Sequence, residues 1–183
     1  MTTELFLVLS AIGPDRPGLV AELTEYLTSR GANIEDSRMA VLGGDFGILV
    51  LVSGGPEPIV AVERDHEALS DRTGLSVMLR RTKSPADHRR AAVIPCLVTA
   101  EAIDQEGIVR AVSRALHQIG VNIVSLETTA FPAPVTGSPL FRLEARVDVP
   151  QATGIARVRK AMEDVAVAEN LDIQVRSLIA RGG

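Results

Sequence analysis

Apolar residues recur along this chain in two alternating forms, short runs of strand length and longer stretches at helical spacing. The first run, Leu5 to Ile12, is almost continuously apolar, so we expect a strand that is covered on both faces. The next stretch predicts an amphipathic helix, because its apolar residues recur at helical spacing. The expected buried face of that helix comprises Leu19, Val20, Leu23 and Leu27.

The same alternation continues through both halves of the chain. In the first half it predicts strands at 33–41, 46–53 and 76–82, and a second amphipathic helix over 58–70. In the second half it predicts a helix from about 108, a longer helix over 151–170, and strands at 93–99, 122–131, 140–149 and 173–179. The polar stretch 83–91 contains Pro85 and is predicted to link a domain 1–82 to a domain 92–183.

The residues before the first helix form an unusual combination. Gly13 and Pro14 are expected to end the strand. Asp15 is expected to cap the helix with its carboxylate, and Pro17 to lie in the first turn, where its missing N–H costs nothing. Gly18 is costly in a helix, so we expect it to let a ligand approach the backbone. The free amides there predict a site for an anion, such as the carboxylate of a small acid.

This helix and its flanking residues occur twice, at an offset of 89 positions (104 − 15). The shared features are the capping aspartate, the unusual glycine, the glycine that ends the helix and the Asn-Ile pair that opens the following strand. We interpret the repeat as a tandem duplication. Matching positions include Asp15 and Asp104, Gly18 and Gly107, Asn33 and Asn122, and Ile34 and Ile123.

The segment DRPGLVAELTEYLTSRGANIED, residues 15–36, resembles the opening of an ACT domain, a small ligand-sensing module. Two such modules with little else resemble the tandem ACT proteins of the glycine cleavage system transcriptional repressor type. The resemblance implies an α+β chain of two ferredoxin-like βαββαβ domains with the strand order 4-1-3-2. Strand two of each domain would lie at an edge, which is a liability unless covered. We expect the two edges to pair, giving one continuous antiparallel sheet of eight strands.

The resemblance also implies where a ligand binds. In ACT domains that bind amino acids, a small zwitterion is held by the loop before the first helix and by the start of strand two. Asp15 would meet the ammonium group, and amides near Gly18 and Leu19 would meet the carboxylate. The residues implied are Gly13, Pro14, Asp15, Arg16, Gly18, Leu19, Asn33 and Ile34, and in the second copy Asp104, Gly107, Ile108, Asn122 and Ile123.

Ordinary structural roles compete with some of these assignments. A solvated side chain is the better explanation for Arg16 than a ligand contact, and Asn33 could equally cap its own turn. Glu106 in the second copy would repel a carboxylate. The second copy is therefore open to two interpretations, as a second ligand site or as a cover for the edge of the first copy.

Composition limits the classes of function. A net charge of −4 and an aromatic content of 3% argue against direct nucleic-acid binding, which needs a basic face or aromatic platforms. One cysteine and three scattered histidines give neither metal-site spacing nor a nucleophile with its base. Phosphate-loop and nucleophile-elbow motifs are missing from the sequence. We therefore expect a protein that is not an enzyme and uses no cofactor or metal.

The same composition bears on location and partners. The sequence shows no export signal and no apolar run of membrane-spanning length. A single cysteine fits a reducing compartment, so we expect a cytoplasmic protein without a membrane partner. By resemblance, the chain would bind a small amino acid such as glycine and modulate a protein partner, such as a transcriptional regulator. The alternative is a detached regulatory subunit of an amino-acid metabolic enzyme, and a homodimer is left open.

Overall fold

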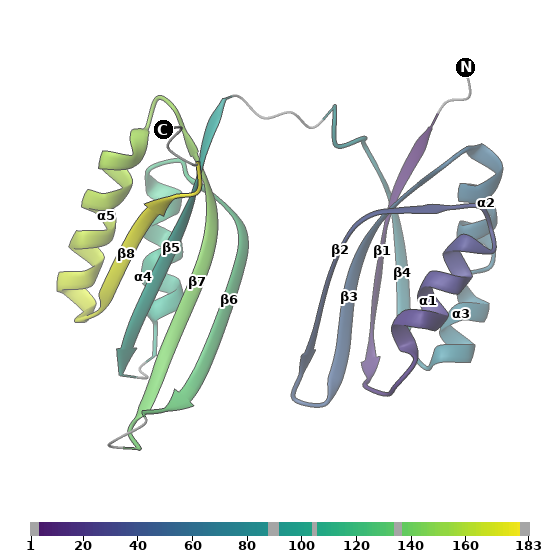
Figure 1. Cartoon of the computed structure of the whole chain (residues 1–183), viewed down its shortest axis with the longest axis horizontal. Helices are drawn as coiled ribbons and strands as arrows, with labels where there is room; N and C mark the ends of the chain where they lie inside the picture. The colour runs from purple at the N-terminus through teal and green to yellow at the C-terminus, as the bar shows by residue number, and fades with distance from the viewer. Residues whose placement is uncertain (1–3, 88–91, 104–105, 134–136, 180–183) are drawn as a thin grey trace. The chain divides into compact units, whose positions relative to one another are not determined.

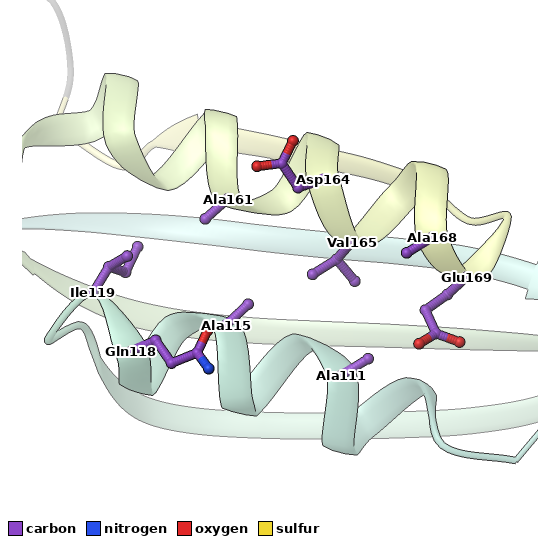
Figure 2. A pocket seen from close by; sticks show the side chains of 9 residues that line it. All are labelled: Ala111, Ala115, Gln118, Ile119, Ala161, Asp164, Val165, Ala168 and Glu169. Atoms are coloured by element: carbon purple, nitrogen blue, oxygen red, sulfur yellow. The ribbon is translucent and has the colours of Figure 1, made fainter.

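The computed structural model describes residues 4–87, 92–103, 106–133 and 137–179. The chain divides into two compact units, Met1–Arg89 and Arg90–Gly183. The change from one unit to the next lies inside the predicted linker, whose bounds stay a prediction. In Figure 1 each unit consists of one sheet with its helices packed on one face.

The first unit is a four-stranded antiparallel sheet with the order β2-β3-β1-β4. Helices α1, α2 and α3 cover one face of this sheet (Figure 1). Its elements are β1 (Leu5–Pro14), α1 (Leu19–Thr28), β2 (Asn33–Leu42), β3 (Asp45–Gly54), α2 (Pro56–Arg64), α3 (His66–Thr73) and β4 (Ser76–Thr82).

The second unit repeats the arrangement, with the order β6-β7-β5-β8. Each unit has its own apolar core between sheet and helices. The elements are β5 (Val93–Ile103), α4 (Ile108–Gln118), β6 (Asn122–Pro132), β7 (Pro139–Pro150), α5 (Gly154–Glu169) and β8 (Asp172–Ser177).

The predicted fold class and the strand order 4-1-3-2 are confirmed in both units. In each unit the described strands form one antiparallel sheet of four. The pairing of the two edges into one sheet of eight strands stays a prediction.

Two local predictions in the first unit need correction. Strand β1 ends at Pro14 and not at Ile12, because Gly13 and Pro14 continue the ladder opposite Phe46 and Asp45. The single helix expected over 58–70 is two helices, α2 and α3, because the backbone leaves the helical region at Asp65 (φ −100°, ψ 9°). The carboxylate of Asp65 accepts hydrogen bonds from Arg30 and Arg64 at this break.

The expectation that β1 is covered on both faces is also wrong. Leu7, Leu9 and Ala11 are buried under the helices, whereas Ile12 on the opposite face is 59% exposed. Successive side chains of a strand point to opposite faces, so helices on one side leave the other side open. The first sheet thus has a helix-covered face and an open face.

The buried face of α1 differs from the prediction at two positions, Val20 and Tyr26. Leu19, Leu23, Tyr26 and Leu27 are buried, whereas Val20 is 43% exposed. The Tyr26 hydroxyl donates a hydrogen bond of 2.7 Å to the carbonyl oxygen of Val62 and so ties α1 to α2. None of the helices within the described residues is both long and apolar enough to cross a bilayer.

Candidate functional site

Helix α1 begins with a glycine in a left-handed conformation. Gly18 is the N-cap residue, with φ 95° and ψ −11°. The prediction that Asp15 caps the helix is wrong, and Pro17 precedes the cap instead of lying in the first turn. A positive φ strongly disfavours residues with a Cβ. Backbone conformation therefore explains Gly18 without any close approach of a ligand.

The first turn of α1 presents backbone N–H groups without a side-chain cap. Among the described residues, no side chain makes a capping hydrogen bond at this helix start. The first bond inside the helix runs from the amide of Glu22 to the carbonyl of Gly18, 2.9 Å. The amides of Leu19, Val20 and Ala21 precede that bond and so have no partner within the helix. Together with the helix dipole they favour an anion at this end.

The loop that leads into α1 is held by contacts within the unit. The Asp15 amide donates a 3.0 Å hydrogen bond to the carbonyl of Gly44, in the turn between β2 and β3. A Cβ on Gly13 would lie 3.0 Å from the carbonyl oxygen of Gly74 and 3.1 Å from the Leu75 side chain. Gly13 is thus required by packing against the segment before β4. These contacts fix the loop against both neighbouring strands.

A surface groove of about 470 Å³ lies between this helix start and the far end of β2. One wall is the loop and first turn of α1, and the other is formed by Met39 and Phe46. Met39 is 50% exposed, so apolar surface is open to solvent beside the free amides. The groove is lined by Asp15, Arg16, Gly18, Leu19, Val20, Ala21, Met39 and Phe46.

Arg16 and Glu22 form an ion pair across the first turn of α1. The guanidinium donates two hydrogen bonds to the carboxylate, of 2.5 and 3.0 Å. The hydrogen bond from Arg16 lowers the pKa of Glu22 below its ordinary value. Arg16 is therefore held beside the amides by a carboxylate of the same helix. An incoming anion would meet a cation that is already oriented but partly neutralised.

The other predicted residues of the first unit lie elsewhere. Asn33 and Ile34 open β2, and Asn33 pairs with Ser53, whereas Pro14 pairs with Asp45. The two points are eight residues apart along β3, roughly 26 Å at the rise of a strand. Within one unit, the structure therefore does not bring the Asn-Ile pair to the groove. The Asn33 amide instead donates to Glu35, 2.8 Å away.

The second unit repeats the helix start. Gly107 is the N-cap of α4 with φ 96°, and no side chain of the described residues caps it. Ile108 is buried, as Leu19 is, so only its backbone can face a ligand. Asn122 donates to the carbonyl of Ile123, 3.2 Å away, at the other end of the sheet. Asp104 lies outside the described residues. The five predicted positions of this unit stay a prediction.

The cysteine belongs to the second unit, not to the unit that carries the groove. Cys96 is fully buried in the second core, and burial raises the pKa of its thiol. A raised pKa keeps the thiol protonated and unreactive. The described residues contain no cluster of three or more histidine, cysteine, aspartate or glutamate side chains able to hold a metal. The groove thus offers backbone amides, one ion pair and apolar side chains.

Sequence reasoning missed Val20, Ala21, Met39 and Phe46 as groove residues. The strand order contained the necessary signal, because it places the start of β3 beside the end of β1. Phe46 is then opposite Gly13 in the ladder, and Met39 pairs with Ile48 on the next strand.

Comparison with known proteins defines the class. Residues 5–80 match the sequence model of the ACT domain. The first unit is therefore an ACT domain, and the second unit has the same strand order.

The chain is similar to a transcriptional repressor over nearly its whole length. It is 26% identical to the glycine cleavage system transcriptional repressor of Escherichia coli (strain K12), over 93% of this chain and 88% of that protein. A crystal structure of an unknown protein from Galdieria sulphuraria is 34% identical, with a TM-score of 0.83, covering 97% of this chain and 100% of that one. A crystal structure of a candidate glycine cleavage system transcriptional repressor is 27% identical, with a TM-score of 0.72, covering 97% and 99%.

One enzyme also contains a related segment. The chain is 28% identical to the phosphoserine phosphatase SerB2 of Mycobacterium tuberculosis (strain ATCC 25618 / H37Rv), over 96% of this chain. The match spans only 41% of that enzyme. The similarity therefore concerns one part of a larger protein.

The left-handed conformation of Gly18 predicts a graded response to substitution. We expect Gly18→Ala to lower the free energy of unfolding by about 1–2 kcal/mol, since its Cβ has room but its φ is unfavourable. Gly18→Asn is expected to cost less, because asparagine tolerates this conformation. Urea denaturation followed by circular dichroism measures both. Equal stability of all three proteins would contradict the assignment.

The Arg16–Glu22 pair predicts a pH effect of definite sign. Because the folded pKa of Glu22 is lowered, the pair stabilises the fold above the ordinary glutamate pKa of about 4.3. That stabilisation is lost as the pH falls through the lowered value. Arg16→Gln is expected to raise the pKa of Glu22 toward its ordinary value. Carboxyl NMR titration of the two proteins measures this, and an unchanged Glu22 pKa would contradict the pair.

Proposed function

We propose that this chain is a non-catalytic regulatory protein that binds a small amino acid in the groove beside Gly18 and thereby alters its affinity for a protein partner. The observation that carries the proposal is the groove itself, in which free helix amides and an oriented cation lie beside exposed apolar side chains. The similarity to a transcriptional repressor over 93% of the chain supports the regulatory role.

Each wall of the groove can contact a different part of an amino acid. The α-carboxylate would accept hydrogen bonds from the amides of Leu19 and Val20, where the helix dipole favours negative charge. The α-ammonium would lie toward the carboxylate of Asp15, which lines the same groove. A side chain on the ligand would contact Met39 and Phe46. Glycine fills the polar part alone, and a larger apolar amino acid fills both parts.

Regulation would follow from the thermodynamic linkage between ligand binding and partner binding. A ligand changes the affinity for a partner only when it binds the partner-competent state more tightly than the other state. The similarity to a transcriptional repressor supports a protein of transcriptional control as the partner. The net charge of −4 gives no reason to place DNA on this chain itself. A cytoplasmic location is part of the same proposal.

A matched pair of variants tests the groove. Val20→Glu places a carboxylate beside the free amides of α1, and Val109→Glu does the same in α4, at the equivalent position 89 residues later. Both valines are partly exposed, and glutamate in a first helical turn is favourable, so the fold is expected to survive. We expect Val20→Glu to weaken binding of the best amino acid about tenfold or more, roughly 1.4 kcal/mol.

Calorimetry with a panel of amino acids, starting with glycine, measures both variants against the unmodified chain. If only the first unit binds, Val109→Glu leaves the affinity and the stoichiometry unchanged. If both units bind, each variant removes about half of the sites. Full binding by Val20→Glu would exclude the groove as the ligand site.

The phosphatase similarity favours a second candidate, a regulatory subunit that acts on an amino-acid metabolic enzyme. In this case the chain would change the rate of a purified phosphoserine phosphatase in an amino-acid-dependent manner. Rate measurements with and without the chain, at several serine and glycine concentrations, test it. A rate that is independent of the chain would leave the transcriptional partner as the better candidate.

A further inference from the structure

The open face of the first sheet carries an apolar surface in three cross-strand rows. Paired residues of neighbouring strands share one face, so the ladder gives the rows in the order β2, β3, β1, β4. They are Asp36-Leu51-Val8-Arg80, Arg38-Leu49-Ser10-Met78 and Ala40-Gly47-Ile12-Ser76. Within these rows Ile12, Leu49 and Met78 are each more than half exposed. We define these twelve residues as the open apolar face.

The equivalent face of the second sheet is polar. Positions that correspond by ladder pairing to Leu49, Leu51 and Met78 are Glu144, Arg146 and Gln174. Ile12 and Gly47 correspond to Glu101 and Arg142, which form an ion pair of 2.7 Å. The two sheets thus have the same fold, but the first exposes apolar side chains to solvent and the second exposes charged and polar ones. The second face is stable in water as it stands, whereas the first exposes contiguous apolar side chains, as interaction surfaces do.

Gly47 adds an independent observation. It lies inside β3, where glycine weakens a strand and often marks a close approach by another backbone or ligand. Its φ is not positive, and a Cβ there would find one atom within reach, the carbonyl oxygen of Ala40 at 4.0 Å. Neither backbone conformation nor packing within the unit requires glycine at this position. The residue instead leaves a depression in the open apolar face.

We propose that two copies of this chain associate by packing the open apolar faces of their first sheets together. Stacked sheets align within about 30°. A two-fold axis parallel to the strands places each row over the same row of the second copy, in the reverse order of strands. Ile12 of one copy then lies over Gly47 of the other, so that a large side chain fills the depression. Leu51 meets Val8, and Leu49 meets Ser10.

The charges at the ends of one row favour a second copy as the occupant. Asp36 lies at the β2 edge, where its carboxylate also pairs with Arg38 of the same strand, and Arg80 lies at the β4 edge of the same row. Under the two-fold operation Asp36 of each copy meets Arg80 of the other, giving two opposite-charge contacts at the rim of the interface. Self-complementarity of this kind is what an isologous interface requires.

The area of the face indicates a reversible dimer. Four strands spaced by about 4.8 Å, over the seven residues of β4, present roughly 450 Å² per copy. Two copies would bury about 900 Å², below the roughly 1,200 Å² of stable specific complexes and in the range of weak, transient ones. The association is therefore expected to depend on protein concentration in the micromolar range. It does not require ligand in the groove, so it stands or falls separately from the proposed function.

Sedimentation equilibrium on the full chain tests the dimer. We expect the mass to rise with concentration from 19.5 kDa toward twice that value. Gly47→Leu and Leu49→Lys are each expected to raise the dissociation constant about tenfold or more. A Cβ at position 47 would have the carbonyl oxygen of Ala40 at 4.0 Å and no closer neighbour, and urea denaturation verifies the fold of Gly47→Leu. Val167→Lys, at an 86% exposed position on α5, is the control and leaves the dissociation constant unchanged.

Two results would overturn the proposal. One is a mass of 19.5 kDa at every concentration up to about 1 mM, which would leave the face for a different partner. The other is a dimer that survives both Gly47→Leu and Leu49→Lys, which would place the interface elsewhere.

A charge exchange tests the arrangement of the two sheets. Asp36→Arg alone brings like charges together at both ends of the interface and is expected to weaken association about tenfold. Arg80→Asp alone has the corresponding effect, and the double variant restores the opposite-charge contacts. Recovery in the double variant supports the two-fold arrangement. A double variant as weak as the worse single variant rejects it.

Discussion

The left-handed glycine at the start of α1 and of α4 determines the backbone geometry of each candidate site. A left-handed residue at Gly18 turns the chain from the end of β1 into α1 within a few positions. The turn places the first helical amides at the edge of the sheet without a side-chain cap. Gly107 repeats this geometry in the second unit, with φ within one degree of the first. The duplication therefore preserved a backbone conformation, and the residues around it changed.

One-sided covering of the sheets has an equally broad effect. Helices bury alternate residues of each strand, so the remaining residues of the same strands form a second surface. In the first unit that surface is apolar with a depression at Gly47, and in the second it is charged. The groove and the open apolar face lie on opposite sides of the same sheet. Ligand binding and association can thus use separate residues of one small unit.

Sequence patterning predicted the elements and the strand order well, because alternation and helical spacing directly record which side chains are buried. It failed where tertiary contacts decided the outcome. The predicted helix is divided at Asp65, whose carboxylate binds Arg30 in the turn after α1. Gly13 continues a strand because its packing partner is Leu75, sixty-two positions away. Neither contact has a signal in the local sequence.

The candidate site shows the same limit. Asp15, Arg16, Gly18 and Leu19 are contiguous, so one motif located them together in the groove. Met39 and Phe46 come from a distant hairpin and needed the folded sheet to be recognised. The Asn33-Ile34 pair was assigned from family resemblance, and within one unit it lies at the other end of the sheet. Contiguous parts of a site are readable from sequence, and parts assembled by folding are not.

The chain contains one tyrosine and one cysteine, and the two lie in different cores. Tyr26 is buried in the first unit and Cys96 in the second. Ultraviolet absorption or fluorescence of the phenol ring therefore reports on the folding of the first unit alone. Accessibility of the sulfhydryl to a thiol reagent reports on the opening of the second. The natural sequence thus supplies a separate intrinsic probe for each half, with no label introduced.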